Sequence, residues 1–185
     1  MAYPITKFWF FYPLGKLLIR KIMGRENIPK SIPFIIVSNH KKLVDPLLIL
    51  YPILRKLNKK IHFIATPAWW FLGDTICRKW AACVPVFHPT QAYEETKKLI
   101  ESGEIIGIFP EAGLRKTKNP KTGAIRLALE TKTPILPIGL KSSYLLFNST
   151  MNIGKLIYLK KNKKNLKKQA SDLMKKIYQL GDSKI

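Results

Sequence analysis

Acidic residues are scarce in this chain. Its 185 residues include 11 Asp and Glu against 33 Lys and Arg, so the formal net charge is +22. A charge of this size favours an anionic partner, and nucleic acid, an anionic lipid surface and a phosphorylated metabolite would all qualify. A general use of Lys on solvated faces explains part of the same excess. Only six of the cations are Arg. Because the reading of base edges favours the planar guanidinium group, this argues against sequence-specific recognition of nucleic acid.

Cysteine is also scarce. Cys77 and Cys83 are the only two, they form no Cys-x-x-Cys pair, and there are three histidines. This excludes a disulfide scaffold, gives no reason to expect a metal centre, and predicts a reducing, cytosol-facing environment. The chain also lacks a Gly-x-Ser-x-Gly elbow, a P-loop and a Gly-x-Gly-x-x-Gly turn. The catalytic templates that depend on these motifs are therefore excluded.

Long hydrophobic runs are absent as well. The N-terminal apolar stretch covers residues 8–19 and is interrupted by Pro13, Gly15 and Lys16. It falls short of the roughly 20 residues that cross a bilayer, and it lacks the cleavage site of a signal peptide. Consecutive aromatic residues at 8–11 followed by cations are typical of a segment in the membrane interface. We predict an interfacial, membrane-associating segment over residues 1–24; a helix packed on the core is the alternative.

Residues 25–185 have the length and the alternating pattern of a single α/β domain. Short runs rich in β-branched or aromatic residues predict strands at 34–38, 61–66, 83–87, 105–109, 134–140 and 155–159. Helical patterns lie at 46–57, 68–80, 91–102 and 121–132. A last amphipathic helix, whose apolar positions begin at Leu166, overlaps the end of the basic run at 160–168. This alternation predicts a mostly parallel mixed sheet with helices on both faces, in which functional loops follow the strand ends.

A histidine and an acid lie close together after the first of these strands. His40 comes just past the strand, and Asp45 precedes Pro46, as in a helix N-cap with proline at the first helical position. Residues five apart on one helix point about 140° apart, so this pair meets only if a turn folds Asp45 back. A carboxylate bonded to one imidazole nitrogen leaves the other free to take a proton from a hydroxyl group. A plain helix cap and an ordinary loop histidine are the alternative interpretations.

A second loop of this kind follows the strand at 105–109. Pro110 ends the strand, and Glu111 is one of the few acids. Ala112 and Gly113 are small enough for close approach of the backbone to a ligand, and Arg115 begins a set of cations that suits a phosphate group. A solvated basic loop is the alternative. Two strand-end loops that both carry scarce acids favour an enzyme site.

These loops resemble the motifs of the glycerolipid acyltransferases typified by lysophosphatidic acid acyltransferase (1-acylglycerol-3-phosphate O-acyltransferase). The sequence NHKKLVD at 39–45 fits the family's His-x4-Asp motif, and FPEAGLR at 109–115 is similar to its Phe-Pro-Glu-Gly-Thr-Arg motif. Weaker resemblances follow in the same order at AACVPVFH (81–88), TPILPIGL (133–140) and MNIGKLIY (151–158). Together they extend from about residue 25 to about residue 180.

The resemblance implies a glycerolphosphate-acyltransferase-like fold and a specific reaction. A fatty acyl group would move directly from acyl-CoA or acyl carrier protein to the hydroxyl of a lysophospholipid or glycerol phosphate, giving phosphatidic acid when the acceptor is lysophosphatidic acid. The implied catalytic residues are His40 as general base and Asp45 as its orienting partner. The implied substrate-binding residues are Asn39, Glu111, Ala112, Gly113 and Arg115.

The resemblance also implies the partners. These are the acyl donor as co-substrate with no further cofactor or metal, the lysophospholipid acceptor and an anionic membrane surface, and no nucleic acid. The implied location is peripheral or monotopic at the cytoplasmic face of a membrane.

Several positions depart from the family's motifs. Lys41 and Lys42 follow the histidine, where a small hydroxyl residue is more usual at the second position. Arg115 comes four residues after the glutamate, so either the intervening alanine replaces the family's glycine or one residue is inserted. His88 stands where an arginine is expected. Two alternatives therefore stay open: a catalytically degenerate homologue that binds lipid without turnover, and a basic nucleic-acid-binding protein.

Overall fold

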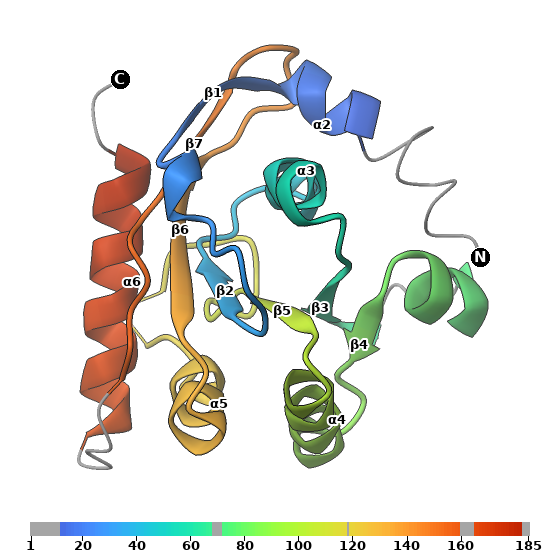
Figure 1. The fold of residues 1–185 in the computed structure, drawn as a ribbon, viewed down its shortest axis with the longest axis vertical. Helices are drawn as coiled ribbons and strands as arrows, with labels where there is room; N and C mark the ends of the chain where they lie inside the picture. Colours follow the sequence, from blue (N-terminus) through green and yellow to red (C-terminus); the bar gives the residue numbers. More distant parts are fainter. Residues whose placement is uncertain (1–11, 68–71, 118, 160–164, 183–185) are drawn as a thin grey trace.

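The strands form one seven-stranded sheet in the order β1-β7-β6-β2-β5-β3-β4 (Figure 1). The computed structural model describes residues 12–67, 72–117, 119–159 and 165–182, without the side chain of Trp80. Paired strands are parallel except for β6 and β7, which are antiparallel. The predicted single α/β domain with a mostly parallel sheet is confirmed. The strands are β1 (Ile19–Met23), β2 (Ile35–Ser38), β3 (Ile61–Ala65), β4 (Cys83–Pro85), β5 (Ile105–Ile108), β6 (Ile135–Lys141) and β7 (Ser149–Ile153).

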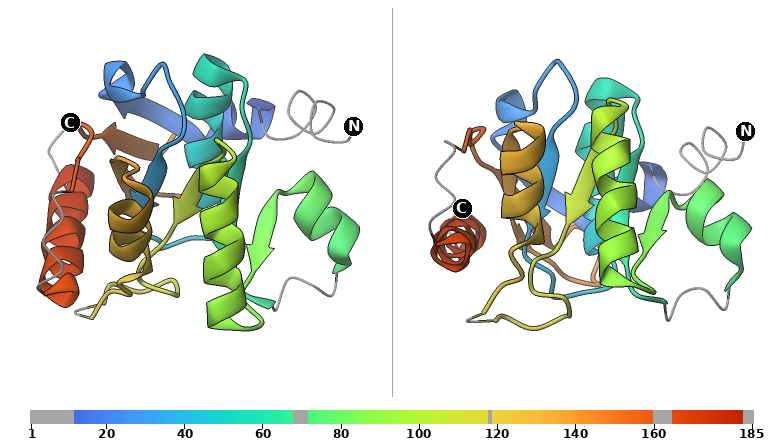
Figure 2. Two further views of the ribbon diagram at one scale, coloured as in Figure 1. Left: turned by 60° about the horizontal axis from the view of Figure 1, so that its bottom comes forward. Right: turned by 90° about the horizontal axis from the view of Figure 1, so that it is seen from below.

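Helices cover both faces of this sheet (Figures 1 and 2). One face carries α2 (Tyr12–Leu18) and α3 (Asp45–Leu57). The other carries α4 (Pro89–Glu101), α5 (Gly123–Thr131) and α6 (Leu166–Asp182). Two short turns complete the elements, a 3-10 turn at Arg25–Asn27 and a π-helical turn at Thr75–Trp80.

The central strands contribute to two hydrophobic cores, one on each face. On β2 all four residues are buried, with Ile36 packed in the core under α3 and with Ile35 and Val37 in the core under α5 and α6. Successive side chains of a strand point to opposite faces, so a strand covered on both sides must be apolar throughout. This is why the central strands read as unbroken apolar runs.

The prediction of a strand at 155–159 is wrong. The last strand is β7, at Ser149–Ile153, and the later segment makes one isolated antiparallel bridge, from Ile157 to Ile135. Pro137 lies next to this bridge on β6, and its carbonyl oxygen accepts the N–H of Gly154. Because proline has no N–H to donate on that side, the ladder cannot continue along the segment.

Two predictions fall only partly on described residues. Residues 19–23 form β1, whose parallel pairing with β7 brings part of the predicted 1–24 segment into the sheet. Residues 1–11 lie outside the described residues, and the interfacial character of the segment stays a prediction. Of the helix predicted at 68–80, the structure shows the π-helical turn at Thr75–Trp80. Residues 68–71 lie outside the described residues. Within the described ranges, no helix combines the length and the apolar character that crossing a membrane requires.

Gly139 on β6 lies against the backbone of α6. A Cβ atom at this position would lie 2.6 Å from the carbonyl carbon of Leu180 and 2.7 Å from the carbonyl oxygen of Ile177. These backbone atoms cannot yield without moving the helix, so we expect Gly139→Ala to destabilise the fold by about 1–3 kcal/mol. Urea unfolding measures the loss.

The matched control is Gly123→Ala at the first residue of α5. There no atom of the other described residues, beyond its chain neighbours and the backbone of its own helix, lies within 4 Å of the added carbon, and the variant should be neutral or slightly stabilised. Equal free energies of unfolding for the two variants would contradict the close packing of β6 on α6.

Candidate active site

The loops that follow β2 and β5 meet at one edge of the sheet. These strands are parallel, hydrogen-bonded neighbours near its centre. β2 ends at Ser38, just before His40, and β5 ends at Ile108, shortly before Glu111. The structure therefore brings together the two loops that carry the sequence motifs, as expected for the carboxyl ends of parallel strands.

Asp45 orients the imidazole ring of His40. The Nδ1 atom of His40 lies 3.0 Å from Oδ2 of Asp45, whose side chain is fully buried, while the histidine side chain is 18% exposed. The ring also stacks on Phe109, with centroids 4.2 Å apart and planes 18° from parallel. Because a carboxylate can only accept, the neutral ring carries its proton on Nδ1 and leaves Nε2 unprotonated. Nε2 is thus the atom that can take up a proton.

The carboxylate of Asp45 organises the loop before the helix. Its Oδ2 atom also accepts the backbone N–H groups of Lys41 at 2.6 Å and Lys42 at 2.8 Å. Helix α3 begins at Asp45 itself, Val44 is the cap residue, and no side chain caps the first turn. The turn that folds Asp45 back onto His40, which the pair needs in order to meet, is present. The prediction that Asp45 is the N-cap is wrong, because its carboxylate is turned toward the preceding residues.

Glu111 connects the His40 loop to the last helix. Its Oε2 atom accepts the backbone N–H of His40, and its Oε1 atom accepts the hydroxyl of Tyr178 on α6 at 2.6 Å. Burial raises the pKa of Glu111 above its usual value, and the hydrogen bonds from Tyr178 and His40 oppose that shift. Burial, with the bond to Glu111, raises the pKa of Tyr178 to about 12, so its hydroxyl stays a donor at neutral pH.

An apolar cavity of about 560 Å³ adjoins His40. It extends between the start of α3, the end of β3, the start of β4, the turn at Thr75–Trp80 and the loop after β5. Its lining is largely aliphatic and aromatic, with Phe63 and Phe109 in the wall and both cysteines, Cys77 and Cys83, among the lining residues. Such a cavity suits a hydrocarbon chain better than a polar metabolite.

The side chain of Asn39 forms its hydrogen bonds with the backbone of β6. It is 2% exposed, its Nδ2 donates to the carbonyl of Leu140 at 2.9 Å, and its Oδ1 accepts the N–H of Leu140 at 2.7 Å. These bonds tie the start of the loop to β6. The geometry indicates that Asn39 positions the His40 loop, where the sequence predicted a contact with substrate.

The other predicted binding residues lie in an exposed turn after Glu111. Ala112 has a φ of 52°, in the left-handed region that favours glycine, which supports the interpretation that it stands in place of the family's glycine. Among the described residues, and apart from its two chain neighbours, no atom lies within 4 Å of a Cβ placed on Gly113. Arg115 is exposed and, among the described residues, has no hydrogen-bond or ion-pair partner. The turn therefore offers open backbone and a free guanidinium group.

Several other polar residues lie away from the cavity. His88 is exposed and directly precedes α4, and Arg78 bonds to Asp74 and Glu95. Neither lines the cavity, so the structure provides no arginine in place of His88 there. In the part of the chain that is described, no three His, Cys, Asp or Glu side chains are grouped so as to hold a metal ion.

Sequence patterns gave little signal for two residues of the site. Tyr178 follows Met174 and Ile177 at ordinary helical spacing, and nothing local distinguishes it from a packed helix residue. Phe109 does lie in the FPEAGLR motif, but its stacking on His40 depends on the pairing of β2 with β5. Only the tertiary structure assigns either one to the site.

Known proteins resemble this chain in sequence and in fold. A family model described as acyltransferase matches residues 19–141. The chain is 31% identical over 154 residues to a 1-acyl-sn-glycerol-3-phosphate acyltransferase of Borreliella burgdorferi, an alignment that covers 75% of this chain and 58% of that protein. It is 30% identical over 123 residues to a protein of the same name from Bacillus subtilis, covering 63% and 60%. The chain thus spans less than two thirds of these relatives.

A solved structure has the same architecture. The crystal structure of the 1-acyl-sn-glycerophosphate (LPA) acyltransferase PlsC from Thermotoga maritima matches with a TM-score of 0.69 at 20% identity, covering 94% of this chain and 79% of that one. At this level of identity the similarity shows the fold.

The raised pKa of Glu111 makes stability depend on pH. The folded chain holds this proton to a higher pH than the unfolded chain, so the stability it contributes is complete below the ordinary pKa of 4.5 and is lost as pH rises through the folded pKa. Tyr178→Phe removes a bond that favours the carboxylate and should increase this loss. We expect a destabilisation of about 1.5–3 kcal/mol above the folded pKa and less below it. Urea unfolding of the wild type and of Tyr178→Phe between about pH 4 and 8 measures the free energy of unfolding on both sides of the folded pKa.

Tyr158→Phe is the matched control, because Tyr158 is 71% exposed. It should show no pH-dependent difference from the wild type. A destabilisation by Tyr178→Phe that is the same at every pH would rule out the bond to ionised Glu111.

Proposed function

The chain belongs to the acyltransferase family, and on that premise we propose that it is an enzyme that moves a fatty acyl group from a thioester donor to the free hydroxyl of lysophosphatidic acid, giving phosphatidic acid. The observation that carries the proposal is the His40–Asp45 pair beside an apolar cavity. The names of the relatives support the choice of acceptor. Acyl-CoA and acyl carrier protein both present the required thioester, and no further cofactor takes part.

His40 acts as the general base. Its Nε2 atom takes the proton of the acceptor hydroxyl as that oxygen attacks the thioester carbonyl carbon. A carbon–oxygen bond forms, the carbon–sulfur bond breaks, and the imidazolium returns the proton to the departing thiolate. Asp45 stabilises the imidazolium through the 3.0 Å contact at Nδ1.

The transfer is direct, without an acylated enzyme. Burial raises the pKa of Cys83 to about 11, and it raises the pKa of Cys77 as well. Both thiols of the cavity are therefore protonated at neutral pH, and a protonated thiol is a poor nucleophile. This leaves the acceptor hydroxyl as the group that His40 activates.

The loop after β5 positions the acceptor. Glu111 fixes the backbone of His40, while Ala112 and Gly113 leave room for a glycerol phosphate beside the loop. Arg115, which has no partner among the described residues, supplies a paired hydrogen-bond donor for the phosphate. The acyl chain of the donor occupies the apolar cavity, so that its thioester lies next to His40.

The lipid substrates and the charge of +22 favour an anionic membrane surface as the working place of the enzyme. The enzyme then acts as a peripheral or monotopic protein at the cytoplasmic face, as the reducing environment inferred from the cysteines suggests. Nucleic acid is not a partner in this proposal, because binding to it would make no use of His40, Asp45 or Glu111.

His40→Ala tests the mechanism. We expect thiol release from acyl-CoA with lysophosphatidate to fall by about 10²–10⁴ while the protein stays folded, since Asp45 keeps its bonds to the N–H groups of Lys41 and Lys42. Release of free thiol is followed by a colorimetric reagent, and phosphatidic acid by mass spectrometry.

The control is His62→Gln, a half-buried histidine on β3 that contacts Glu104 at 3.6 Å and does not line the cavity. This variant should keep wild-type turnover. Full activity in His40→Ala would refute the general-base role. A wild-type chain that binds lysolipid without any turnover would instead identify a degenerate homologue.

A further inference from the structure

Four consecutive large apolar residues are exposed between β6 and β7. Tyr144, Leu145, Leu146 and Phe147 are 55%, 69%, 59% and 56% exposed, and we call this segment the YLLF loop. Single exposed apolar residues are normal on a protein surface, whereas contiguous patches mark interaction sites. Nothing in the proposed chemistry requires these side chains to face outward.

The loop is held in this orientation by hydrogen bonds. The N–H of Phe147 donates to the carbonyl of Leu17 on α2 at 2.7 Å, and the N–H of Leu145 donates to the Ser143 hydroxyl at 3.1 Å. Phe147 has a φ of 50°, an uncommon conformation for an aromatic residue. The apolar side chains are thus displayed by a defined loop that is fastened to α2.

The YLLF loop adjoins the catalytic loop. The hydroxyl of Tyr144 accepts the N–H of Leu43 at 3.4 Å, and Nζ of Lys42 lies 4.4 Å from the centroid of its ring. Leu43 is itself 52% exposed and lines the cavity beside His40. The exposed apolar surface therefore runs from the loop to the mouth of the cavity.

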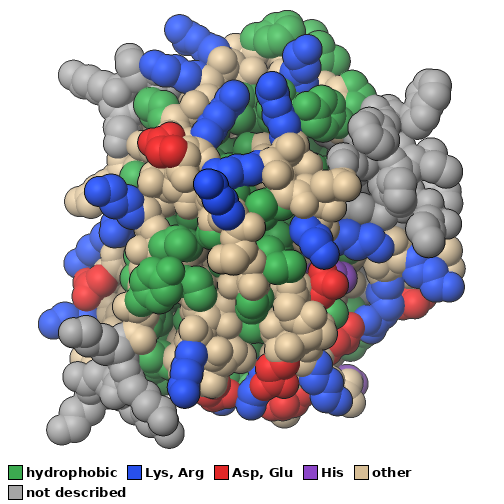
Figure 3. Space-filling view, in the orientation of Figure 1, with side chains coloured by type: hydrophobic (Ala, Val, Ile, Leu, Met, Phe, Trp, Pro, Cys, Tyr) green, Lys and Arg blue, Asp and Glu red, His purple; other side chains and the backbone are tan. Residues whose placement is uncertain are grey.

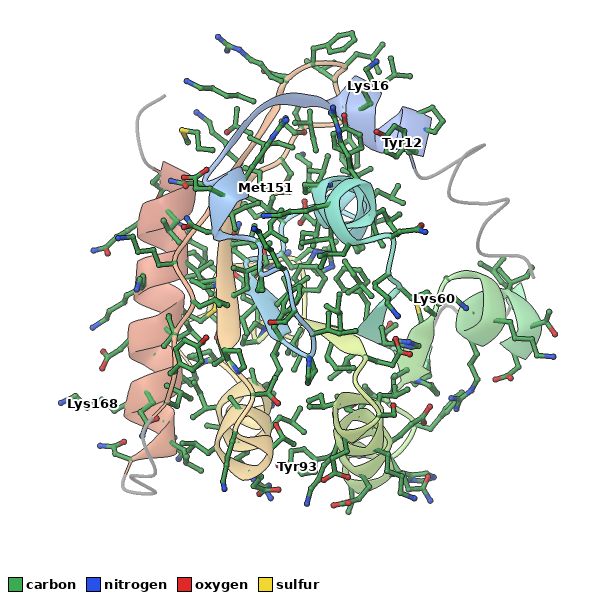
Figure 4. The ribbon with its side chains drawn as sticks, viewed as in Figure 1. Tyr12, Lys16, Lys60, Tyr93, Met151 and Lys168 are labelled. Carbon is green, nitrogen blue, oxygen red and sulfur yellow. The ribbon has the colours of Figure 1, made fainter. Side chains whose placement is uncertain are left out.

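Charge is distributed unevenly along the chain. Residues 12–60, which include α2 and the His40 loop that contact the YLLF loop, carry eleven Lys and Arg against two acids, of which Asp45 is buried. Five of the eleven acids lie instead on α4, on α5 and in the turn before β5. Figure 3 shows Asp and Glu side chains gathered over α4 and α5 at the bottom, and hydrophobic side chains beside Lys and Arg at the top. Lys16 is at this upper end, on α2 (Figure 4).

We propose that the YLLF loop inserts into the interface of a bilayer that contains anionic phospholipid and thereby sets the mouth of the cavity on the membrane. The choice of lipid as the occupant rests on the proposed function, because the acceptor and the acyl chain are both lipids. The flanking cations complement anionic headgroups. A second copy of the chain fits poorly, since it would bring two strongly basic faces together.

Sedimentation with vesicles tests the proposal without any turnover. The double variant Leu145→Ser/Leu146→Ser should bind vesicles of phosphatidylcholine and phosphatidylglycerol about 10- to 100-fold more weakly than the wild type, from the lost burial of two leucines. Leu145→Trp should keep the affinity, because tryptophan favours the membrane interface. Turnover of vesicle-borne lysophosphatidate should fall with binding, while turnover of a water-soluble short-chain acceptor stays unchanged.

Tyr158→Ser is the matched control. Tyr158 is 71% exposed and follows Ile157, which bridges to the start of β6, at the opposite end of that strand from the YLLF loop. The Tyr158→Ser variant should bind vesicles as tightly as the wild type does. Unchanged vesicle binding in the double variant would overturn the proposal, and so would a wild-type dimer that the double variant converts to monomer. Loss of turnover on the soluble acceptor would place the loop in the catalytic site and contradict a docking role.

Discussion

Three consecutive backbone N–H groups, those of His40, Lys41 and Lys42, are held by two carboxylates. Asp45 accepts two of them and Glu111 accepts the third. Hydrogen bonds to an ionised acceptor are shorter and stronger than those between neutral groups, and here both acceptors are buried. The rest of the site depends on this arrangement, because it sets the position of the imidazole ring relative to the cavity. In a chain with 11 acids, two are therefore used to shape a single loop.

The sequence predicted the central part of the fold well because the signals there are local. Apolar runs and helical spacing located β2, β3 and β5 and the helices α3 to α6, and the rule that loops at parallel strand ends meet brought His40 and Glu111 together. The strands at the β1 edge of the sheet were harder to predict. β1 is half exposed, β7 contains Ser, Thr and Asn, and neither carries the apolar pattern of a central strand.

Two further features of the site have physical causes that sequence spacing does not contain. Asp45 followed by Pro46 has the local pattern of a helix cap, but the bonds to the His40 ring and loop outweigh capping. Asn39 looked like a ligand-facing neighbour of the histidine, yet its amide pairs with β6, which is 101 residues away in the chain. Hydrogen bonds within one loop decided the first case, and a contact with a distant strand decided the second.

The contact between Glu111 and Tyr178 spans 67 residues and joins the site to the last helix. During synthesis His40, Asp45 and Glu111 leave the ribosome well before α6 does, and domains fold as their segments emerge. Until α6 docks on β6, the second oxygen of Glu111 lacks its partner. The order of synthesis therefore leaves this contact unmade, and the candidate site incomplete, until the C-terminal helix has packed on the sheet.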